Sequence, residues 1–574
     1  MLSRRSVRLT SAMCPEGDRL GRLSQVLPFG ALFLIPLAAV PWFVEPYTSV
    51  KWHLLAVVAA VWVLVERFLC GSRGLPSVVT RVWPAWAALA VSVVVGSLRD
   101  GLGWALQPLT ARTTFVGLAL ASFWCFRRTR LRLEPVRAAT LAAASIVVLL
   151  ALVQFAGLDL LAWLPGGDHH SATFGNVNMA AQFVGLALVV VLAVAPADSG
   201  QGRRRTVGVV TEVVEAGALA YLWLAGSRSV GLALAAAAGV LLLVGRLTTK
   251  HLLRTVGEAA LLAWLVTAAA PAATGPLASS VRESKRMSAE WRLAVWSDTL
   301  RLIRDHPAGV GSGNFEHAFI PYALGGRSRP GEAIFFRSPH NDYLRLVSEE
   351  GVAATLLLLA LLAALARELH RCPAIARWRS EPGALLASCG AFFLVEAFFQ
   401  FPLELAYPSL LVALLLGLAL ACTEAPTDPE SAGRPGPSRT GLRWAGDAAT
   451  VFLALAIGVG LARVSVAERL AVGSGRDVVG LERACALDPR RLEACVEAAW
   501  LHSRAGEHAA AREALLAVLS RSPWYFPAIK LLGEDLLAAG EPVAGCRHLR
   551  RYDAMFGGGS SVRQRVREFC PPEP

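Results

Sequence analysis

The chain is poor in charged residues and has few long polar stretches. Charged residues make up 17% of its 574 residues, whereas hydrophobic residues make up 55%, and the mean hydropathy is +0.49. Many apolar runs approach the roughly 20 residues that a helix needs to cross a bilayer, which no soluble core requires. The composition therefore excludes an ordinary soluble globular protein and indicates a membrane protein.

Three sequence signals are absent, and their absence argues against a zinc site, a phosphate-binding P-loop and a cleaved signal peptide. The ten cysteines form no CxxC pair, which argues against a zinc site. The glycine-rich stretch 306–315 lacks the Lys-Ser/Thr of a phosphate-binding P-loop, and taken alone it indicates a turn. No small-residue cleavage site follows Val44, so the first apolar run is predicted to stay as a membrane span.

Thirteen apolar segments predict an all-α polytopic fold with about 12 to 13 transmembrane helices. They are residues 26–44, 52–70, 82–98, 112–126, 138–157, 178–196, 206–226, 229–245, 252–272, 351–366, 384–401, 407–422 and 448–464. Seven alternate connections, the first being residues 1–25, hold 26 Lys and Arg residues, whereas the short loops between them hold few. By the positive-inside rule, residues 1–25 are cytoplasmic and the carboxyl terminus is extracytoplasmic. The net charge of +13 thus reflects membrane topology rather than nucleic-acid binding.

The remaining segments divide the chain into regions. Residues 273–350 form the one long polar connection within the polytopic core, residues 26–422, and are predicted to lie on the extracytoplasmic side. A Pro-, Gly- and Ser-rich stretch, residues 423–447, is typical of a flexible linker, and it precedes the last span. Beyond that span, residues 465–574 carry Ala, Leu, Glu and Arg at helical spacing.

An internal repeat runs through residues 465–574. Asp488-Pro489 recurs as Ser522-Pro523, and Ala505-Gly506-Glu507 recurs as Ala539-Gly540-Glu541, and the members of each pair are 34 positions apart. This is the period of the tetratricopeptide helix-turn-helix repeat. Because two or so repeats are few for a free-standing solenoid, they are expected to dock on the membrane core or on a partner.

The same tail contains four of the ten cysteines, Cys485, Cys495, Cys546 and Cys570. An extracytoplasmic tail could form disulfides, but unpaired buried thiols are the expected state of these residues. The other six cysteines lie in or beside the predicted membrane part.

Polar groups gather at three connections on the predicted outer face. One ends with Asn176 and Asn178, a second is a tight turn around Ser227 and Arg228, and the third is the large loop with Arg292. An arginine at the mouth of apolar helices either snorkels to lipid headgroups or holds an anion. With these polar neighbours on the same face, anion binding is the favoured interpretation. The planar guanidinium matches phosphate oxygens and suits a pyrophosphate held without a metal.

The large loop is expected to contain an amphipathic helix over residues 288–305, on which Arg292 and Trp296 share one face. His340 and Asn341 follow Pro339, and His340 is expected to start a helix that leads straight into the next span. Histidine titrates near neutrality and can take a proton from a hydroxyl, which arginine cannot do. A single interfacial histidine more often bonds a backbone carbonyl, but the neighbours of this one favour a catalytic base.

Five short motifs occur in a fixed order along the chain. They are Phe174-Gly175-Asn176-x-Asn178, Ser227-Arg228-Ser229, Arg292-x-x-x-Trp296, His306-Pro307-x-Gly309-x-Gly311, and His340-Asn341-x-x-Leu344 ending in Glu350-Gly351. Over residues 26–422 the chain therefore resembles the O-antigen ligase and polymerase superfamily. One departure is Val177, where that family usually has proline, and it removes no polar group.

The resemblance implies a GT-C-like membrane glycosyltransferase without metal or cofactor, which moves a glycan from an undecaprenyl-diphosphate carrier to an acceptor hydroxyl. Arg228 and Arg292 would bind the donor diphosphate, and His340 would act as the base. The predicted substrate-binding residues are Asn176, Asn178, Ser227, Trp296 and Asn341. The acceptor would be lipid A-core, a protein or the growing glycan, and the repeats could recruit a protein partner. The implied location is the bacterial inner membrane, with the site and the repeats in the periplasm.

Other functions are also compatible with the sequence. A polymerase of the same superfamily is one, and the appended repeats lean towards it. Glu212, Glu215 and Glu396 lie within apolar spans, which is typical of an ion or proton path and would suit a polysaccharide transporter or flippase. The expected alternative is that each glutamate pairs with arginine or faces a polar cavity. A membrane-anchored scaffold that works through its repeats is the third class.

Overall fold

A computed structural model describes most of the chain. The described residues are 19–41, 43, 45–70, 72, 75–98, 102–129, 132–164, 170–194, 201–269, 277–328, 335–372, 379–424, 440–473, 477–556 and 560–572. Within these residues the regular structure is helical, and no strand occurs. The predicted all-α fold is confirmed.

The membrane part and the outer loop comprise the helices up to α18. They are α1 (Arg19–Leu37), α2 (Ser49–Leu64), η1 (Val65–Leu69), α3 (Ser77–Arg81), α4 (Trp83–Leu98), α5 (Leu102–Thr129), α6 (Glu134–Phe155), α7 (Val177–Ala193), α8 (Gln201–Ala225), α9 (Arg228–Leu243), α10 (Thr249–Ala269), α11 (Leu277–Asp305), α12 (Phe315–Leu324), α13 (Asp342–Glu350), α14 (Val352–Arg371), α16 (Glu381–Phe399), η2 (Pro402–Glu404), α17 (Ala406–Cys422) and α18 (Thr440–Gly473). The tail adds α19 (Val478–Leu487), α20 (Leu492–Arg504), α21 (His508–Arg521), α22 (Phe526–Ala538), α23 (Pro542–Met555) and α24 (Arg563–Phe569).

The chain is a multi-pass membrane protein. By length and composition, seven helical segments in the described part can cross a membrane: Ser49–Leu69, Gln107–Arg128, Glu134–Phe155, Val207–Ala225, Val352–Arg371, Glu381–Phe399 and Gly446–Gly473. Five shorter apolar helices, Ser24–Leu37, Trp83–Leu98, Val177–Ala193, Arg228–Leu243 and Ala406–Cys422, coincide with further predicted spans. The remaining predicted span falls on α10, whose first half carries Lys250, Arg254 and Glu258.

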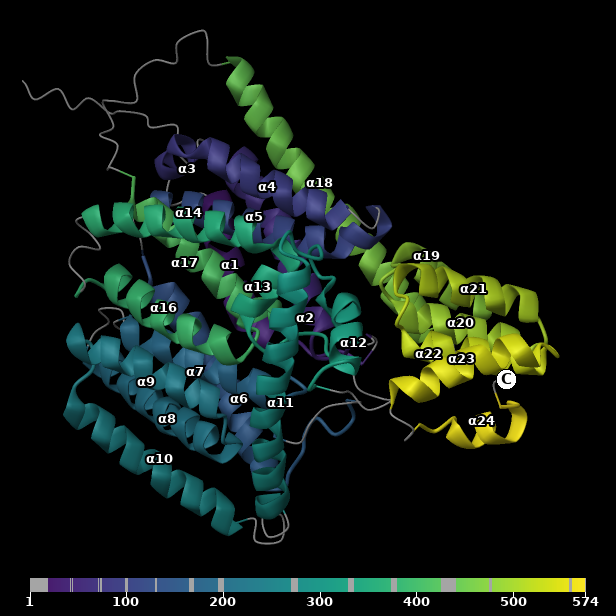
Figure 1. The fold of residues 1–574 in the computed structure, drawn as a ribbon. Helices are drawn as coiled ribbons and strands as arrows, with labels where there is room; N and C mark the ends of the chain where they lie inside the picture. Colours follow the sequence, from purple (N-terminus) through teal and green to yellow (C-terminus); the bar gives the residue numbers. More distant parts are fainter. Residues whose placement is uncertain are drawn as a thin grey trace, which may run out of the picture.

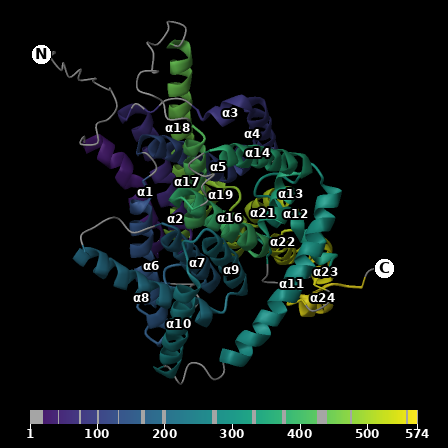
Figure 2. The same ribbon diagram turned by 90° about the vertical axis from the view of Figure 1, so that its left-hand side faces the viewer.

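Helix α11 crosses the direction of the spans. Figure 1 shows α11 standing at a steep angle to α8, α9 and α16, with helices α19–α24 gathered at the far end of α18. In Figure 2, the view turned by 90°, the helices α19–α24 lie behind the spans and α11 runs obliquely along one side. The tail contacts the large loop just after α11, where Arg490 donates hydrogen bonds to the carbonyls of Ser312 and Gly313.

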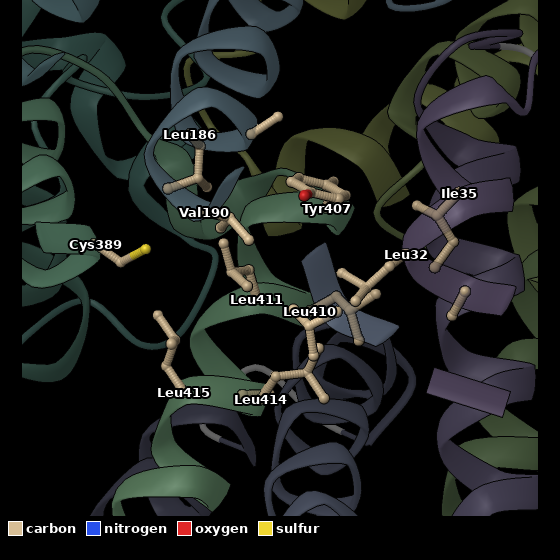
Figure 3. Close-up of a cluster of buried hydrophobic side chains, with 14 of the residues drawn as sticks. Leu32, Ile35, Leu186, Val190, Cys389, Tyr407, Leu410, Leu411, Leu414 and Leu415 are labelled. Carbon is tan, nitrogen blue, oxygen red and sulfur yellow. The ribbon is translucent and has the colours of Figure 1, made fainter. Parts of the chain in front are cut away.

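Helix α17 forms the centre of the membrane part because it is apolar on all sides. Nearly every one of its residues is buried, as expected of a helix without a polar face. Figure 3 shows side chains from α1, α7, α16 and α17 meeting in this core, namely Leu32, Ile35, Leu186, Val190, Cys389, Tyr407, Leu410, Leu411, Leu414 and Leu415. The Phe183 and Tyr407 rings meet edge to face at 4.6 Å, so α7 is anchored to this centre.

The tail helices repeat with the period that the sequence predicts. Helix α22 begins and ends 34 residues after α20, and α23 begins and ends 34 residues after α21. Gly506 and Gly540, both with φ +80°, occupy the turns between the helices of each pair. The assignment of these helices to the tetratricopeptide family stays a prediction.

The expectation of unpaired thiols in the tail is wrong. Cys485 pairs with Cys495 across the α19–α20 turn, and Cys546 pairs with Cys570, with Cα–Cα distances of 5.2 and 5.4 Å. Helical hairpins bring residues of successive helices within disulfide range, which spacing along the sequence does not reveal. The free cysteines of the described chain all belong to the membrane part: Cys70, Cys125, Cys372, Cys389 and Cys422.

Two predicted boundaries need correction. Residues 425–439 of the predicted flexible linker lie outside the described residues, but residues 440–447 are already helical because α18 is longer than the predicted span 448–464. Asp447 accepts a 2.6 Å hydrogen bond from Arg67 Nε, which attaches this end of α18 to the membrane core. Residues 1–18 of the predicted amino-terminal segment also lie outside the described residues, and residues 19–25 belong to α1.

Candidate active site

His340 lies just before helix α13 instead of starting it. Asn341 caps the helix, since its side-chain oxygen accepts a 2.9 Å hydrogen bond from the Leu344 amide, and the helix begins at Asp342. His340 has φ +52°, a left-handed conformation that residues with a side chain rarely adopt and that concentrates at functional sites. The predicted helix start at His340 is therefore wrong, because the asparagine that follows it is the stronger cap.

The predicted continuous run from His340 into the next span is also wrong. Gly351, with φ +87°, separates α13 from α14. Helix α13 is therefore a separate short helix, and His340 is not part of the span α14.

The imidazole of His340 is half-buried between neighbours from the end of α16. Its Nδ1 lies 3.5 Å from Gln400 Oε1, and its ring centroid lies 5.1 Å from that of Phe401. Burial lowers the pKa of His340, the positive charge of Arg292 lowers it further, and the contact with Gln400 opposes both. The imidazole is therefore neutral at pH 7 and has a nitrogen that can accept a proton.

Trp296 fixes the chain immediately before His340. Its indole Nε1 donates a 2.9 Å hydrogen bond to the carbonyl of Pro339, and its ring meets that of Phe398 edge to face at 5.3 Å. Helix α11, which carries Trp296, begins at Leu277 and is thus longer than the predicted helix over residues 288–305. In the structure Trp296 thus contacts the chain next to His340, and its predicted substrate-binding role stays a prediction.

Arg292 lies one turn before Trp296 on α11 and is half-buried. Burial lowers the pKa of its guanidinium, and the carboxylate of Glu396 opposes this shift. The side chain makes no hydrogen bond or ion pair within the described part of the chain. A charged, partly desolvated guanidinium without a direct partner is suited to bind an anion.

Glu396 joins the segments that carry the two predicted arginines. It lies on α16 and is fully buried. Its Oε1 accepts a 3.2 Å hydrogen bond from the hydroxyl of Ser229, which follows Arg228 in the first turn of α9. Its Oε2 has no hydrogen-bond partner among the described residues. The same carboxyl group is close enough to Arg292 to influence its pKa, so α9, α11 and α16 converge on one buried side chain.

Arg228 is the first residue of α9, and its side chain is exposed, with no hydrogen bond or ion pair to other described residues. The preceding residue, Ser227, occupies the cap position, and its hydroxyl is buried without a partner in the described chain. The amino-terminal end of a helix favours negative charge because its first N–H groups have no partner within the helix. Arg228 and Ser227 thus form a short polar edge that is open to an anionic ligand.

The two predicted asparagines begin helix α7. The Asn176 side-chain oxygen accepts hydrogen bonds from the amides of Asn178 and Met179, at 2.9 and 3.3 Å, and so caps the helix. Asn178 is half-buried in the first turn. Asn341 has the same kind of capping role on α13. The structure therefore accounts for Asn176 and Asn341 as caps, and the substrate-binding role of the three asparagines stays a prediction.

Two glutamines near the site were missed in the sequence. Gln400 faces His340, and Gln182 is buried in α7 with neither side-chain polar atom hydrogen-bonded to another described residue. Each is a lone amide within or at the end of an apolar span, which is the signal that could have identified it. Gly185 follows Gln182 by about one helical turn. A Cβ atom added at Gly185 would lie 2.7 Å from Val230, so α7 and α9 are in close contact.

The glycine-rich stretch after α11 packs onto the end of α13. The amide of Val310 donates to Ser348 O and that of Gly311 to Glu349 O, both at 2.9 Å. Gly309 has φ +82°, and a Cβ there would overlap the carbonyl oxygen of Glu349. The turn predicted for this stretch is present, and close backbone approach to α13 explains its glycines.

The other two intramembrane glutamates have partners on α10. Arg254 Nη2 lies 2.7 Å from Glu212, and His251 Nε2 lies 2.8 Å from Glu215. Pairing with arginine or facing a polar cavity was the expected alternative to an ion path, and Glu212 pairs with arginine whereas Glu215 pairs with histidine. Among the described residues, no group of three or more His, Cys, Asp or Glu side chains could hold a metal ion.

A comparison with protein families gives a match in the middle of the chain. The family model described as O-antigen ligase matches residues 216–359. This segment contains Arg228, Arg292 and His340 and ends in α14, before the repeat helices of the tail. No curated protein matches the chain.

Proposed function

Since residues 216–359 match the O-antigen ligase family, we propose that the protein transfers a glycan from an undecaprenyl-diphosphate carrier to an acceptor hydroxyl. The observation that carries the proposal is a half-buried imidazole whose pKa is lowered by burial and by the neighbouring guanidinium of Arg292. Glu396 accepts a hydrogen bond from Ser229 and interacts electrostatically with Arg292. The turn that carries Arg228 is therefore linked to the surroundings of Arg292 and His340.

His340 acts as the general base on the acceptor. With a proton on Nδ1 directed at Gln400 Oε1, the lone pair is on Nε2, where it can take the proton of the acceptor hydroxyl. The acceptor oxygen then forms a bond to the anomeric carbon as the bond from that carbon to the lipid diphosphate breaks. The carrier leaves as a diphosphate with an additional negative charge, and the proton stays on the imidazole until it is lost to solvent.

Arg228 and Arg292 stabilise the leaving diphosphate. Negative charge grows on the leaving oxygen in the transition state, and guanidinium groups that are already positioned stabilise it without reorganisation. The exposed Arg228 meets the donor at the membrane edge, while the half-buried Arg292 lies next to the base. Asn176, Asn178, Ser227 and Asn341 line the same outer edge as substrate contacts.

The test uses full-length protein in detergent with a lipid-linked glycan donor. Substitution of His340, Arg228 or Arg292 by Ala is expected to lower the transfer rate by about two to three orders of magnitude, since each removes one electrostatic or proton-transfer group. The matched control is Arg254→Ala, because Arg254 is exposed and pairs with Glu212 and Glu258 away from the site. Wild-type transfer by all three variants, at normal protein level, would refute the mechanism.

Ligation and polymerisation differ in their acceptors, and glycan profiling of a deletion strain separates them. Long lipid-linked chains with a bare acceptor indicate lost ligation, whereas single repeat units on the final acceptor indicate lost polymerisation. We place the site and the repeats on the periplasmic side of a bacterial inner membrane because basic residues gather on the opposite side. The lipid A-core, protein and growing-glycan acceptors are all hydroxyl acceptors that this chemistry can use.

A transporter is the weaker alternative. Glu212 and Glu215 are paired with Arg254 and His251, and Glu396 faces Ser229 and Arg292 at the candidate site. A transporter would move lipid-linked glycan across the membrane without changing its covalent structure. Formation of a new glycosidic product by purified protein in detergent distinguishes the enzyme from the transporter.

A further inference from the structure

We propose that the tail repeats bind the protein's own outer loop, residues 273–350, and that this contact positions His340 for transfer. The tail would then be part of the catalytic apparatus rather than a docking module for other proteins. The positioning half of this inference rests on the proposed function, whereas the contact itself does not.

Arg490, in the turn between α19 and α20, makes the first contact. Its guanidinium donates hydrogen bonds to the carbonyls of Ser312 and Gly313 and to Asn314 Oδ1, which is 3.1 Å away. Gly313 has φ +70°, and a Cβ there would lie 3.0 Å from the guanidinium nitrogens. One side chain of the tail thus holds three consecutive residues of the outer loop, and a glycine permits its close approach.

The electrostatic surroundings suit a guanidinium at this place. Burial lowers the pKa of Arg490, while the carboxylates of Glu349, Asp488 and Glu316 oppose the shift. The planar fork of arginine can reach several acceptors at once, and a lysine ammonium at this position would satisfy fewer of them. The contact therefore depends on arginine and not merely on positive charge.

The held segment is bonded directly to α13. Gly311 donates to the backbone of Glu349, and Ser312 Oγ donates a 2.8 Å hydrogen bond to Glu350 Oε1. Glu350 also pairs with Arg112 of α5, which ties the end of α13 to the membrane core. Helix α13 begins two residues after His340. A continuous set of contacts therefore runs from Arg490 through the glycine-rich stretch to the predicted base.

A second contact lies on the other side of His340. The Phe335 ring stacks on Phe526 of α22, with centroids 4.2 Å apart and planes 4° apart, and also on Tyr525 at 5.2 Å. The next ring, Phe336, faces the opposite way and meets Trp291 of α11 at 5.6 Å. Successive side chains of an extended segment point to opposite sides. This short stretch is thus fixed between the repeats and α11, five residues before His340.

These contacts identify what the repeats bind. Two helical pairs expose apolar surface at their ends, and in this chain Phe335 covers part of the cluster formed by Leu492, Leu515, Tyr525 and Leu532. The partner is a segment of the same chain that presents an aromatic ring and a row of backbone carbonyls. Deletion of the whole tail would not separate this role from that of a scaffold, because both predict lost function, whereas point variants do.

The experiment uses full-length protein in detergent with Arg490→Ala, Arg490→Lys and Phe335→Ala. Arg504→Ala is the control, since Arg504 is exposed and lies over Trp500 of its own helix, with the guanidinium carbon 4.9 Å from the ring centroid. Amide hydrogen exchange is measured at residues 310–314 and 342–350, and transfer is measured with a lipid-linked donor. We expect faster exchange in both segments and at least a tenfold lower kcat for Arg490→Ala and Phe335→Ala, with donor KM nearly unchanged. Arg490→Lys should be intermediate and Arg504→Ala should match wild type.

The outcomes separate the two halves of the proposal. Unchanged exchange in Arg490→Ala and Phe335→Ala overturns the contact. Faster exchange with unchanged kcat overturns the positioning role and leaves the contact. If wild-type protein forms no glycosidic product, the proposed function fails, and the exchange data still decide whether the tail holds the loop. Arg490→Lys retains the charge, so it provides a folded variant if Arg490→Ala does not accumulate.

Discussion

The hydroxyl of Ser229 donates a 3.2 Å hydrogen bond to Glu396, and this bond joins the residue after Arg228 to a carboxylate that opposes the lowering of the Arg292 pKa. Two arginines that are 64 positions apart in the sequence are thus connected through one buried group. A buried charge is retained only where hydrogen bonds and opposite charge offset its desolvation. A change at Glu396 should therefore affect both arginines that are predicted to bind the donor diphosphate, Arg228 and Arg292.

Replacing Glu396 with Gln should weaken donor binding while the fold is kept. The amide of this variant could still accept a hydrogen bond from Ser229, but it would no longer attract Arg292 electrostatically. We therefore expect roughly a tenfold rise in donor KM, equivalent to about 1.4 kcal/mol. Glu396→Ala should be more damaging because it leaves the Ser229 hydroxyl unpaired. Steady-state kinetics in detergent measure the effect, with Glu212→Gln as the matched control. Equal KM values for Glu396→Gln and wild type would remove Glu396 from this account.

Trp296→Phe tests whether the chain before His340 needs to be anchored. Phenylalanine keeps an aromatic ring against Phe398 but leaves the buried carbonyl of Pro339 without its donor, at a cost of about 1 to 3 kcal/mol. We expect a lower kcat and little change in donor KM. Leu300→Ala, on the exposed side of the same helix, is the control for general loosening of α11. If only KM rises, Trp296 contacts substrate and does not position the base.

Transfer should be insensitive to pH near neutrality and should fall in acid. Burial and Arg292 lower the pKa of His340 below its ordinary value of 6.5, so the neutral base persists until the pH falls through the lowered pKa. Below that pH the imidazole is protonated and cannot accept the acceptor proton. The acid limb of kcat/KM in wild type is therefore expected below pH 6.5.

The charge of Arg292 provides a matched comparison for this pH profile. Arg292→Gln removes the positive charge that lowers the pKa of His340, so its residual activity should show an acid limb at higher pH than wild type. Arg292→Lys retains the charge and should leave the limb nearly in place. An identical limb in the Gln variant would mean that another group controls the profile.

Gly309 and Gly239 offer contrasting tests of backbone requirements. Gly309→Ala would place a methyl group on the Glu349 carbonyl at a left-handed φ, and we expect a loss of more than about 3 kcal/mol, seen as poor accumulation or a lower Tm. Gly239 lies within α9 with no other atom within 4 Å of its added Cβ. Gly239→Ala should therefore be neutral or stabilise by about 0.5 to 1 kcal/mol. Equal thermal stability of the two variants would contradict the packing of the glycine-rich stretch on α13.

The helices could be predicted from the sequence because their signals are local. Apolar runs and the 34-residue repeat locate the predicted spans and the tail helices, although α1, α5 and α18 begin several residues before the predicted spans. The order of the motifs also indicated that Arg292 and His340 share one side of the protein, and in the structure Arg292 lowers the pKa of His340.

The remaining features depend on residues far apart in the chain. The helix start at His340 was mispredicted because a cap at Asn341 competes with it, and the tail disulfides depend on how α19 and α20 pack. The glycines of residues 306–315 look like an ordinary turn until the carbonyl of Glu349 is placed beside them. Neither the role of Gln400 nor that of Arg490 can be inferred without the fold that brings them to His340 and Gly313.

The bond between Cys485 and Cys495 encloses Arg490 in a ring of eleven residues. Closing a ring of this length lowers the conformational entropy of the unfolded chain, which stabilises the folded turn by about 3 kcal/mol. The turn that carries Arg490 is thereby ordered for its contacts with the carbonyls of Ser312 and Gly313. A newly made chain whose thiols are still reduced would have every predicted catalytic group, but its contact between Arg490 and the large loop would be weaker. Oxidation of these two cysteines would then be a maturation step that raises activity once the tail reaches a compartment that forms disulfides.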